Sequence, residues 1–181
     1  CMAWTNDWDF PENDKKDYSQ CFESKIVPQV KEILTQYGEL CLIWFDTPTT
    51  LSPAQSQTLV DMVHTYQPNC LINSRIGNGR GDYHSCGDNQ TDFIENGEHK
   101  TVGAKTGLYE CPATLNDTPA TLNDTWGYKS FDNNWKDARR VLELKRHLNE
   151  RGINYLLNVG PDYLGRIPAP AAQILRSAGR A

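Results

Sequence analysis

Residues 40–46 read Leu-Cys-Leu-Ile-Trp-Phe-Asp, and residues 70–75 read Cys-Leu-Ile-Asn-Ser-Arg. Each stretch begins with a short apolar run and ends in polar residues, which is typical of a strand buried in a parallel sheet. Helical patterns precede and separate the two runs, so strands and helices alternate along the chain. The predicted fold class is therefore α/β, with a parallel sheet covered by helices.

Caps and helix breakers bound the other expected elements. Ser52 followed by Pro53 is typical of a helix start, and Pro28 is expected to kink or interrupt the first helix. The Gly- and Asp-rich stretch 77–107 is expected to be loop. We expect helices over 17–37, 53–66, 135–150 and 168–177, and strands over 40–45, 70–75, 107–110 and 153–160.

The composition excludes several classes of protein. The 181 residues carry 18 Lys and Arg against 23 Asp and Glu, a net charge of −5, without a basic cluster suited to nucleic acid. No apolar run approaches the roughly 18 residues of a membrane span. The six cysteines lack CxxC spacing, so we expect reduced thiols and no metal site. Residues 1–10 lack the pattern of a signal peptide, and a cytoplasmic location is expected.

Polar residues follow the predicted strands, where the chemistry of parallel α/β folds gathers. Asp46 follows the strand 40–45, and it either caps the next turn or acts as a functional carboxylate. Arg75 either forms a structural ion pair or holds that carboxylate or a substrate hydroxyl. Glu110 is expected to end the strand 107–110. Two strand-end carboxylates with aromatic residues nearby suit glycoside hydrolysis.

One heptapeptide, Pro-Ala-Thr-Leu-Asn-Asp-Thr, occurs at 112–118 and again at 119–125. Seven residues are too few for a solenoid repeat, so we interpret the pair as a local tandem duplication. It places seven extra residues between Glu110 and Trp126.

Four motifs, in order along the chain, resemble those of one enzyme family. They are IWFD at 43–46, INSRIGNGRGDY at 72–83, YECPATLNDTWGYK read across the duplication at 109–129, and NYLLNVGPDYLGRIP at 154–168. Together they resemble the retaining α-L-fucosidases of glycoside hydrolase family 29. The resemblance implies a glycoside hydrolase of carbohydrate metabolism that acts on a fucosylated oligosaccharide or glycoconjugate, without a metal or an organic cofactor.

The resemblance also implies roles for individual residues. Asp46 would be the catalytic nucleophile and Glu110 the general acid/base of a double displacement. Arg75 would lie in the fucose pocket. The aromatic residues Trp44, Tyr109 and Trp126 would complete the substrate-binding set, with Tyr109 in place of the tryptophan usual in the family.

The family's catalytic domain is a (β/α)8 barrel, and residues 1–181 correspond to its second half, a single truncated domain. We expect about four to five parallel strands with covering helices. The histidine motifs of the first half are absent from this sequence. Open sheet edges and an uncovered apolar face favour association, so a homo-oligomer is expected to complete the barrel. The alternatives are a non-catalytic fucose- or glycan-binding remnant and an inactive truncated fragment. Glu110 is expected to keep its place, with the duplication forming a bulge.

Overall fold

The computed structural model describes residues 9–10, 17–46, 51–89, 94–95, 98–99, 107–115 and 126–180. The chain divides into two compact units. The first comprises Cys1–His84 and Thr101–Leu108, and the second comprises Ser85–Lys100 and Tyr109–Ala181. Within the described residues, no helix is both long and apolar enough to cross a membrane.

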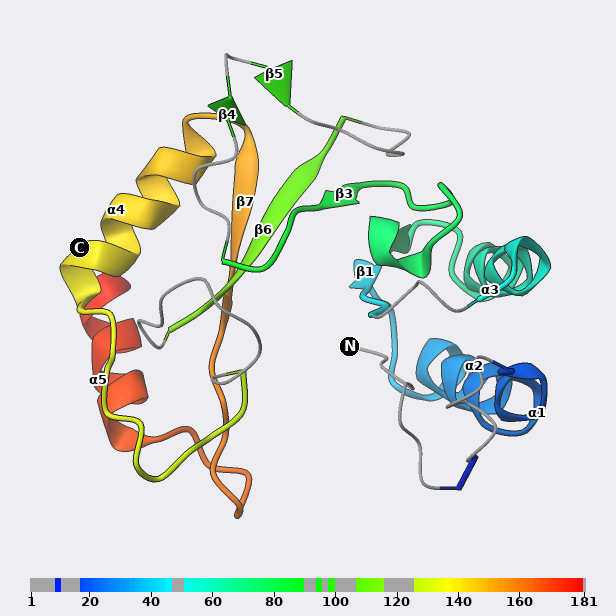
Figure 1. Cartoon of the computed structure of the whole chain (residues 1–181), viewed down its shortest axis with the longest axis horizontal. Helices are drawn as coiled ribbons and strands as arrows, with labels where there is room; N and C mark the ends of the chain where they lie inside the picture. The colour runs from blue at the N-terminus through cyan, green and yellow to red at the C-terminus, as the bar shows by residue number, and fades with distance from the viewer. Residues whose placement is uncertain are drawn as a thin grey trace. The chain divides into compact units, whose positions relative to one another are not determined.

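The first unit contains a helical segment, two short strands and a second helix (Figure 1). Its helical segment runs without a break from Ser19 to Gln36, but a π-helical turn separates α1 from α2. Pro28, in the first turn of α2, has no N–H to donate to the preceding turn, but helical structure continues through it, so the predicted interruption is not found and the predicted kink stays a prediction. The elements are α1 (Ser19–Cys21), the π-helix η2 (Phe22–Ile26), α2 (Val27–Gln36), β1 (Leu42–Ile43), α3 (Pro53–Tyr66), β2 (Leu71–Ile72) and the 3₁₀ helix η4 (Ser74–Ile76).

Helix α3 begins and ends where the sequence predicted. Ser52 Oγ accepts a hydrogen bond from Gln55 N at 3.2 Å, and Gln55 Oε1 accepts one from Ser52 N at 2.9 Å. This reciprocal pair is a capping box, and Pro53 occupies the first helical position. The amino end of α3 is thus fixed by local chemistry.

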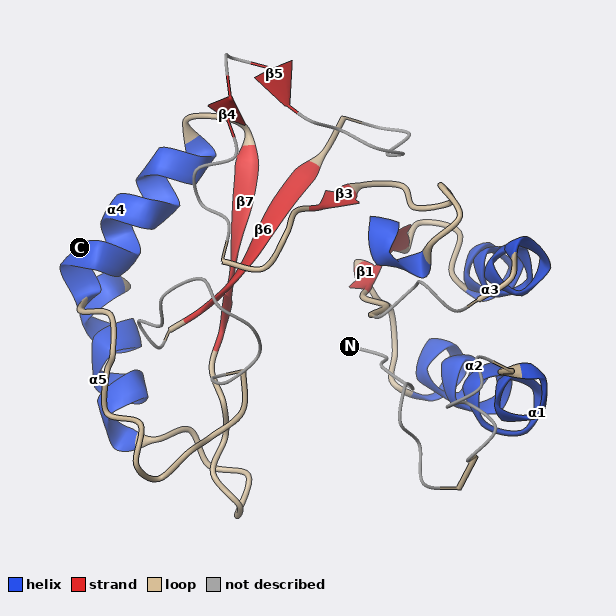
Figure 2. Cartoon of the chain, in the orientation of Figure 1, coloured by secondary structure: helices blue, strands red, loops and turns tan. Residues whose placement is uncertain are grey.

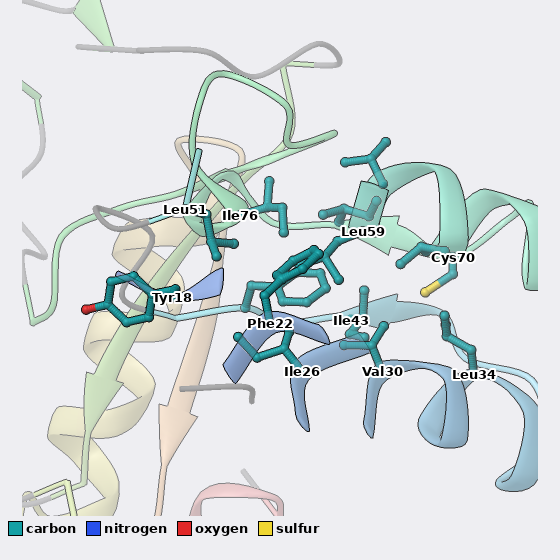
Figure 3. Packing of buried hydrophobic residues seen from close by; sticks show 14 of the residues in the cluster. Tyr18, Phe22, Ile26, Val30, Leu34, Ile43, Leu51, Leu59, Cys70 and Ile76 are labelled. Carbon is teal, nitrogen blue, oxygen red and sulfur yellow. The ribbon is translucent and has the colours of Figure 1, made fainter. Parts of the chain in front are cut away.

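Strands β1 and β2 pair in parallel, with Leu42 opposite Leu71 and Ile43 opposite Ile72. Both are much shorter than the expected strands 40–45 and 70–75. Ile43 and Ile72 are buried, whereas Leu42 and Leu71 are 40% and 36% exposed, so only one face of the pair is covered. The core on the covered face draws on both helices (Figure 3). It includes Phe22, Ile26, Val30, Leu34, Ile43, Leu59, Val63 and Ile72.

The second unit contains a three-stranded sheet and two helices (Figure 2). The sheet order is β3-β6-β7, and β6 and β7 run parallel from Tyr109 opposite Ile153 to Thr114 opposite Asn158. Buried residues of α4 and α5 pack with buried and partly buried residues of these strands. The elements are β3 (His84–Ser85), which begins at the last residue of the first unit, β4 (Ile94–Glu95), β5 (Glu98–His99), β6 (Tyr109–Thr114), α4 (Ala138–Asn149), β7 (Ile153–Asn158) and α5 (Ala169–Ala178).

Two expectations about this region are wrong. The stretch 77–107 is not all loop, because β3 lies in it and joins the sheet, and β4 and β5 pair antiparallel within it. Glu110 does not end its strand, because β6 continues to Thr114. Pro112 obscured this extension, since proline disfavours a strand interior. The Pro112 carbonyl points toward the side of β6 on which β3 lies, and it accepts a hydrogen bond from Asn89 N. The ring nitrogen of Pro112 faces the same side, where β3 has already ended at Ser85. Proline is therefore tolerated at this position.

The α/β class with parallel strands and covering helices is confirmed. Strand β1 pairs in parallel with β2, and β6 pairs in parallel with β7. Strand β3 is also parallel to β6, because the hydrogen bonds from His84 N to Leu108 O and from Cys86 N to Glu110 O move along both strands in the same direction. The half-barrel, its completion by oligomerisation and the single-domain organisation stay predictions.

Candidate functional site

Asp46 follows the carboxyl end of β1, and its carboxylate forms an ion pair with the guanidinium of Arg75. Arg75 Nη1 donates to Asp46 Oδ1 at 3.2 Å. The Asp46 side chain is 29% exposed and that of Arg75 is 17% exposed, so the pair is partly shielded yet open to solvent on one side. The structure thus brings together the predicted nucleophile and Arg75, for which an ion pair, a contact to this carboxylate and a contact to a substrate hydroxyl were the alternatives.

Trp44 joins the same cluster. The Arg75 guanidinium carbon lies 4.7 Å from the centroid of the Trp44 ring, within the range of a cation–π contact. This stacking, together with the ion pair to Asp46, fixes the planar guanidinium in one orientation. Three of the six predicted site residues therefore form one cluster in the first unit.

The segment 73–83, which carries Arg75, folds back against β2. Ile72 N donates to Asp82 Oδ2 at 2.9 Å, while Asp82 N donates to Ile72 O at 2.7 Å. Gly81 passes so close to Ser74 that an added Cβ would lie 2.5 Å from Ser74 Cα. Asn78 Nδ2 donates to Leu51 O at 3.0 Å and thereby ties the segment to the start of α3. Backbone and side-chain contacts of this segment therefore hold Arg75 in place.

Asn73 is the residue whose role sequence reasoning missed. Its side-chain amide accepts from Phe45 N and donates to Phe45 O, both at 2.9 Å, and Asn73 is fully buried. In the sequence it stood out only as a polar residue after a predicted strand. Nothing in the local pattern pointed to a partner 28 residues away.

Glu110 lies in the second unit and is 5% exposed. It is the second residue of β6 and pairs with Asn154, while its backbone carbonyl accepts from Cys86 N at 2.8 Å. Thr114, at the carboxyl end of β6, lies four positions further along the chain, which is about 13 Å along a strand. Among the described residues, Glu110 is therefore placed toward the amino end of its strand.

Trp126 is held at the other end of the same strand pair. Asn158 Nδ2 donates to Trp126 O at 2.8 Å, and Leu115 N donates to Asn158 O at 3.0 Å. Leu115 and Trp126 therefore both bind Asn158 at the carboxyl end of β7. The expected bulge, including the second copy at 119–125, lies outside the described residues.

Tyr109 does not accompany Trp126. It packs against a buried cluster of the second unit, in which Cys86, Cys111, Leu148 and Ile153 are the buried members. Its ring contributes to the core beside α4, and its role in binding substrate stays a prediction. The structure therefore separates Tyr109 and Glu110 from Trp126 along β6 and β7.

A partly exposed carboxylate oriented by an arginine suits nucleophilic attack on a sugar. The aromatic face beside it suits contact with the apolar C–H surface of a sugar ring. Among the described residues, no group of His, Cys, Asp and Glu side chains is placed to hold a metal ion. The cluster in the first unit is therefore the candidate active site.

Comparison with known proteins places this chain in a family. The family model described as Alpha-L-fucosidase matches residues 2–180. The chain belongs to the alpha-L-fucosidase family. A comparison with curated protein sequences found no match.

Solved alpha-L-fucosidases have the same fold over this region. Unliganded alpha-L-fucosidase AlfC from Lactobacillus casei is 47% identical, with a TM-score of 0.78 over 96% of this chain and 48% of its own. An AlfC variant in complex with Fucα(1,6)GlcNAc is 48% identical, with a TM-score of 0.76 over 96% of this chain and 48% of its own. Alpha-L-fucosidase from Vibrio sp. strain EJY3 is 30% identical, with a TM-score of 0.74 over 92% of this chain and 28% of its own. The chain therefore spans about half the length of AlfC.

Proposed function

We propose that these residues form part of a retaining α-L-fucosidase that releases terminal α-L-fucose from glycosides. The observation that carries the proposal is the cluster in which Arg75 donates to Asp46 and stacks on Trp44. Family membership supports the substrate class, because AlfC variants were solved with Fucα(1,6)GlcNAc and with 4-nitrophenyl α-L-fucopyranoside.

In the proposed first step, Asp46 attacks the anomeric carbon of fucose. The bond from that carbon to the leaving oxygen breaks, and Glu110 gives this oxygen its proton. In the second step Glu110 takes a proton from water, the hydroxyl adds to the anomeric carbon, and the bond to Asp46 breaks. Fucose leaves with its configuration retained. Arg75 orients the Asp46 carboxylate throughout, and Trp44, Tyr109 and Trp126 contact the substrate.

A second candidate function is glycan binding without turnover. The position of Glu110 favours it, because this carboxylate lies toward the amino end of β6, whereas barrel chemistry gathers at the carboxyl ends. In that case the cluster around Asp46 would still bind fucose but would lack an acid. Binding without product release is its signature.

We also propose that the chain acts as a homo-oligomer. Exposed leucines on uncovered strand faces support this: Leu42 and Leu71 in the first unit, and Leu156 of β7, which is 41% exposed. Sedimentation at micromolar concentration tests it. A complex of two or more copies is expected, and a monomer would contradict oligomerisation without affecting the assignment of Asp46.

The function itself is tested with 4-nitrophenyl α-L-fucopyranoside. The full chain is expected to release nitrophenol, and Asp46→Asn is expected to lower kcat by at least about 1,000-fold, since it removes the nucleophile. Asp61→Asn is the matched control, because Asp61 is an exposed residue of α3 whose Oδ1 accepts only a side-chain amide contact from Gln57 in the described structure. Binding of fucose without turnover would favour the second candidate. Equal turnover by both variants would exclude Asp46 as the nucleophile.

A further inference from the structure

We propose that Asn73 is the positioning residue that holds Asp46 and Arg75 in reactive alignment. The inference rests on the proposed function, in which Asp46 is the nucleophile. In the described contacts, Asn73 does not bond to the Asp46 carboxylate or to the Arg75 guanidinium. It acts instead on the backbone that leads to each of these two residues.

The first contact fixes the backbone that leads into Asp46. Asn73 Oδ1 accepts from Phe45 N, and Asn73 Nδ2 donates to Phe45 O, both at 2.9 Å. Phe45 stands between Trp44 and Asp46, so this two-point clamp fixes the peptide groups on which both side chains are mounted. Both Phe45 and Asn73 are fully buried, where such bonds are shielded from competing water.

The clamp joins the two segments beyond the last pair of the β1–β2 ladder. The β1–β2 pairing ends at Ile43 opposite Ile72, two residues before Phe45. Beyond it, the amide of Asn73 presents one donor and one acceptor, as a neighbouring strand would. Without this amide, the buried N–H and C=O of Phe45 would lose these partners at a free-energy cost.

The second contact fixes the segment that carries Arg75. Asn73 is the residue on which the 3₁₀ helix η4 starts, and its carbonyl accepts from Ile76 N at 3.2 Å. Its backbone also forms an isolated parallel bridge with Tyr83. Asn73 therefore fixes the backbone next to Asp46 through its side chain, and it fixes the start of the segment that carries Arg75 through its own backbone.

Asn73→Asp and Asn73→Ser test the inference in the full chain. Aspartate keeps the shape and the acceptor but loses the donor to Phe45 O, and serine is too short to span both groups. For both variants, kcat for 4-nitrophenyl α-L-fucopyranoside is expected to fall roughly 10- to 100-fold, since a displacement of about 1 Å at a reacting group has that effect. KM is expected to stay within about twofold, because the fucose contacts remain.

Gln67→Glu is the matched control. Gln67 makes the same kind of bonds at the opposite end of β1: its Oε1 accepts from Leu40 N at 2.7 Å, and its Nε2 donates to Leu34 O and Gly38 O. The control removes a side-chain amide that bonds to backbone in the same unit, and it is expected to leave kcat unchanged. If Asn73→Asp does not fold, Asn73→Ser decides alone. An unchanged kcat in the serine variant, or an equal loss in Gln67→Glu, would overturn the inference.

Hydrogen exchange separates failure of this inference from failure of the proposed function. The Phe45 amide is expected to exchange at least about 10-fold faster in Asn73→Ser than in the unaltered chain, and to be unchanged in Gln67→Glu. If the unaltered chain shows no turnover, the proposed function fails while this measurement still reports on the clamp. Equal Phe45 exchange in all three proteins would overturn the clamp regardless of activity.

Discussion

Arg75 Nη1 donates to Asp46 Oδ1 at 3.2 Å across 29 residues of sequence. Each of the two residues lies three positions beyond the last residue of its strand, and those last residues, Ile43 and Ile72, are register partners. The parallel pairing of β1 with β2 therefore carries both side chains to the same level at the same sheet edge. The ion pair follows from strand register.

Arg75→Lys is expected to lower kcat/KM for an aryl α-L-fucoside roughly 10- to 100-fold. Lysine keeps the positive charge, but it lacks the planar guanidinium that stacks on Trp44 while donating to Asp46. Steady-state kinetics measures the change, and urea unfolding shows whether the fold is kept. Arg140→Lys, at an exposed position of α4, is the control. Activity within twofold of the unaltered chain would show that charge alone suffices at position 75.

Glu110→Gln distinguishes a general acid from a structural carboxylate. If Glu110 is the acid, release of a poor leaving group such as a sugar is expected to fall by about 100- to 10,000-fold, and release of fluoride from fucosyl fluoride much less. Azide is expected to restore turnover and to yield fucosyl azide. An equal loss for both substrates without azide rescue would remove Glu110 from the chemistry, consistent with its place near the amino end of β6.

Gly81→Ala is expected to destabilise the chain by about 1–3 kcal/mol, because the new methyl group would overlap the Ser74 backbone. The same overlap would shift η4, and activity is expected to fall with stability. Urea denaturation measures the change in the free energy of unfolding. Gly127→Ala is the control, since an added Cβ there meets nothing within 4 Å. A Gly81→Ala protein as stable as the control would show that the segment 73–83 can move away from β2.

Asp162 should make stability depend on acid pH. The pKa of Asp162 is lowered from its usual 3.8, chiefly because the backbone N–H of Arg166 donates a hydrogen bond to the Asp162 carboxylate. Further hydrogen bonds and the Arg166 charge lower the pKa as well. Because the pKa of Asp162 is lower in the folded than in the unfolded state, the ionised carboxylate stabilises the fold at pH values above the unfolded-state pKa. This stabilisation is lost as the pH falls through the folded-state pKa. Asp162→Asn is therefore expected to lower Tm at pH 6 more than at pH 2. A Tm difference independent of pH would contradict the contribution of this carboxylate.

Elements governed by neighbouring residues could be predicted from the sequence. Ser52, Pro53 and Gln55 lie within four positions of one another, and they define the start of α3 by bonds that need no distant partner. Asp46 and Arg75 were recognisable as strand-end residues because apolar runs precede them.

Strand lengths and partners could not be predicted in this way. Strand β6 extends to Thr114 because it pairs with β7 as far as Asn158. Phe45, beyond the end of β1, is held by the side chain of Asn73, a residue far along the chain. The sequence placed the end of this strand at Glu110, but the strand ends four positions later, at Thr114. Both errors concern hydrogen bonds between segments that the sequence does not place side by side.

The sequence by itself determined the α/β class, the start of α3, the family and the strand-end positions of Asp46 and Arg75, because each rests on local periodicity, capping or ordered motifs. Only the tertiary structure decided that Arg75 holds Asp46, that Asn73 clamps Phe45, and that Glu110 and Trp126 lie toward opposite ends of the β6–β7 pair. These relationships depend on register between strands. Register is set by packing and backbone hydrogen bonds across the sheet, and residues near in sequence do not fix it.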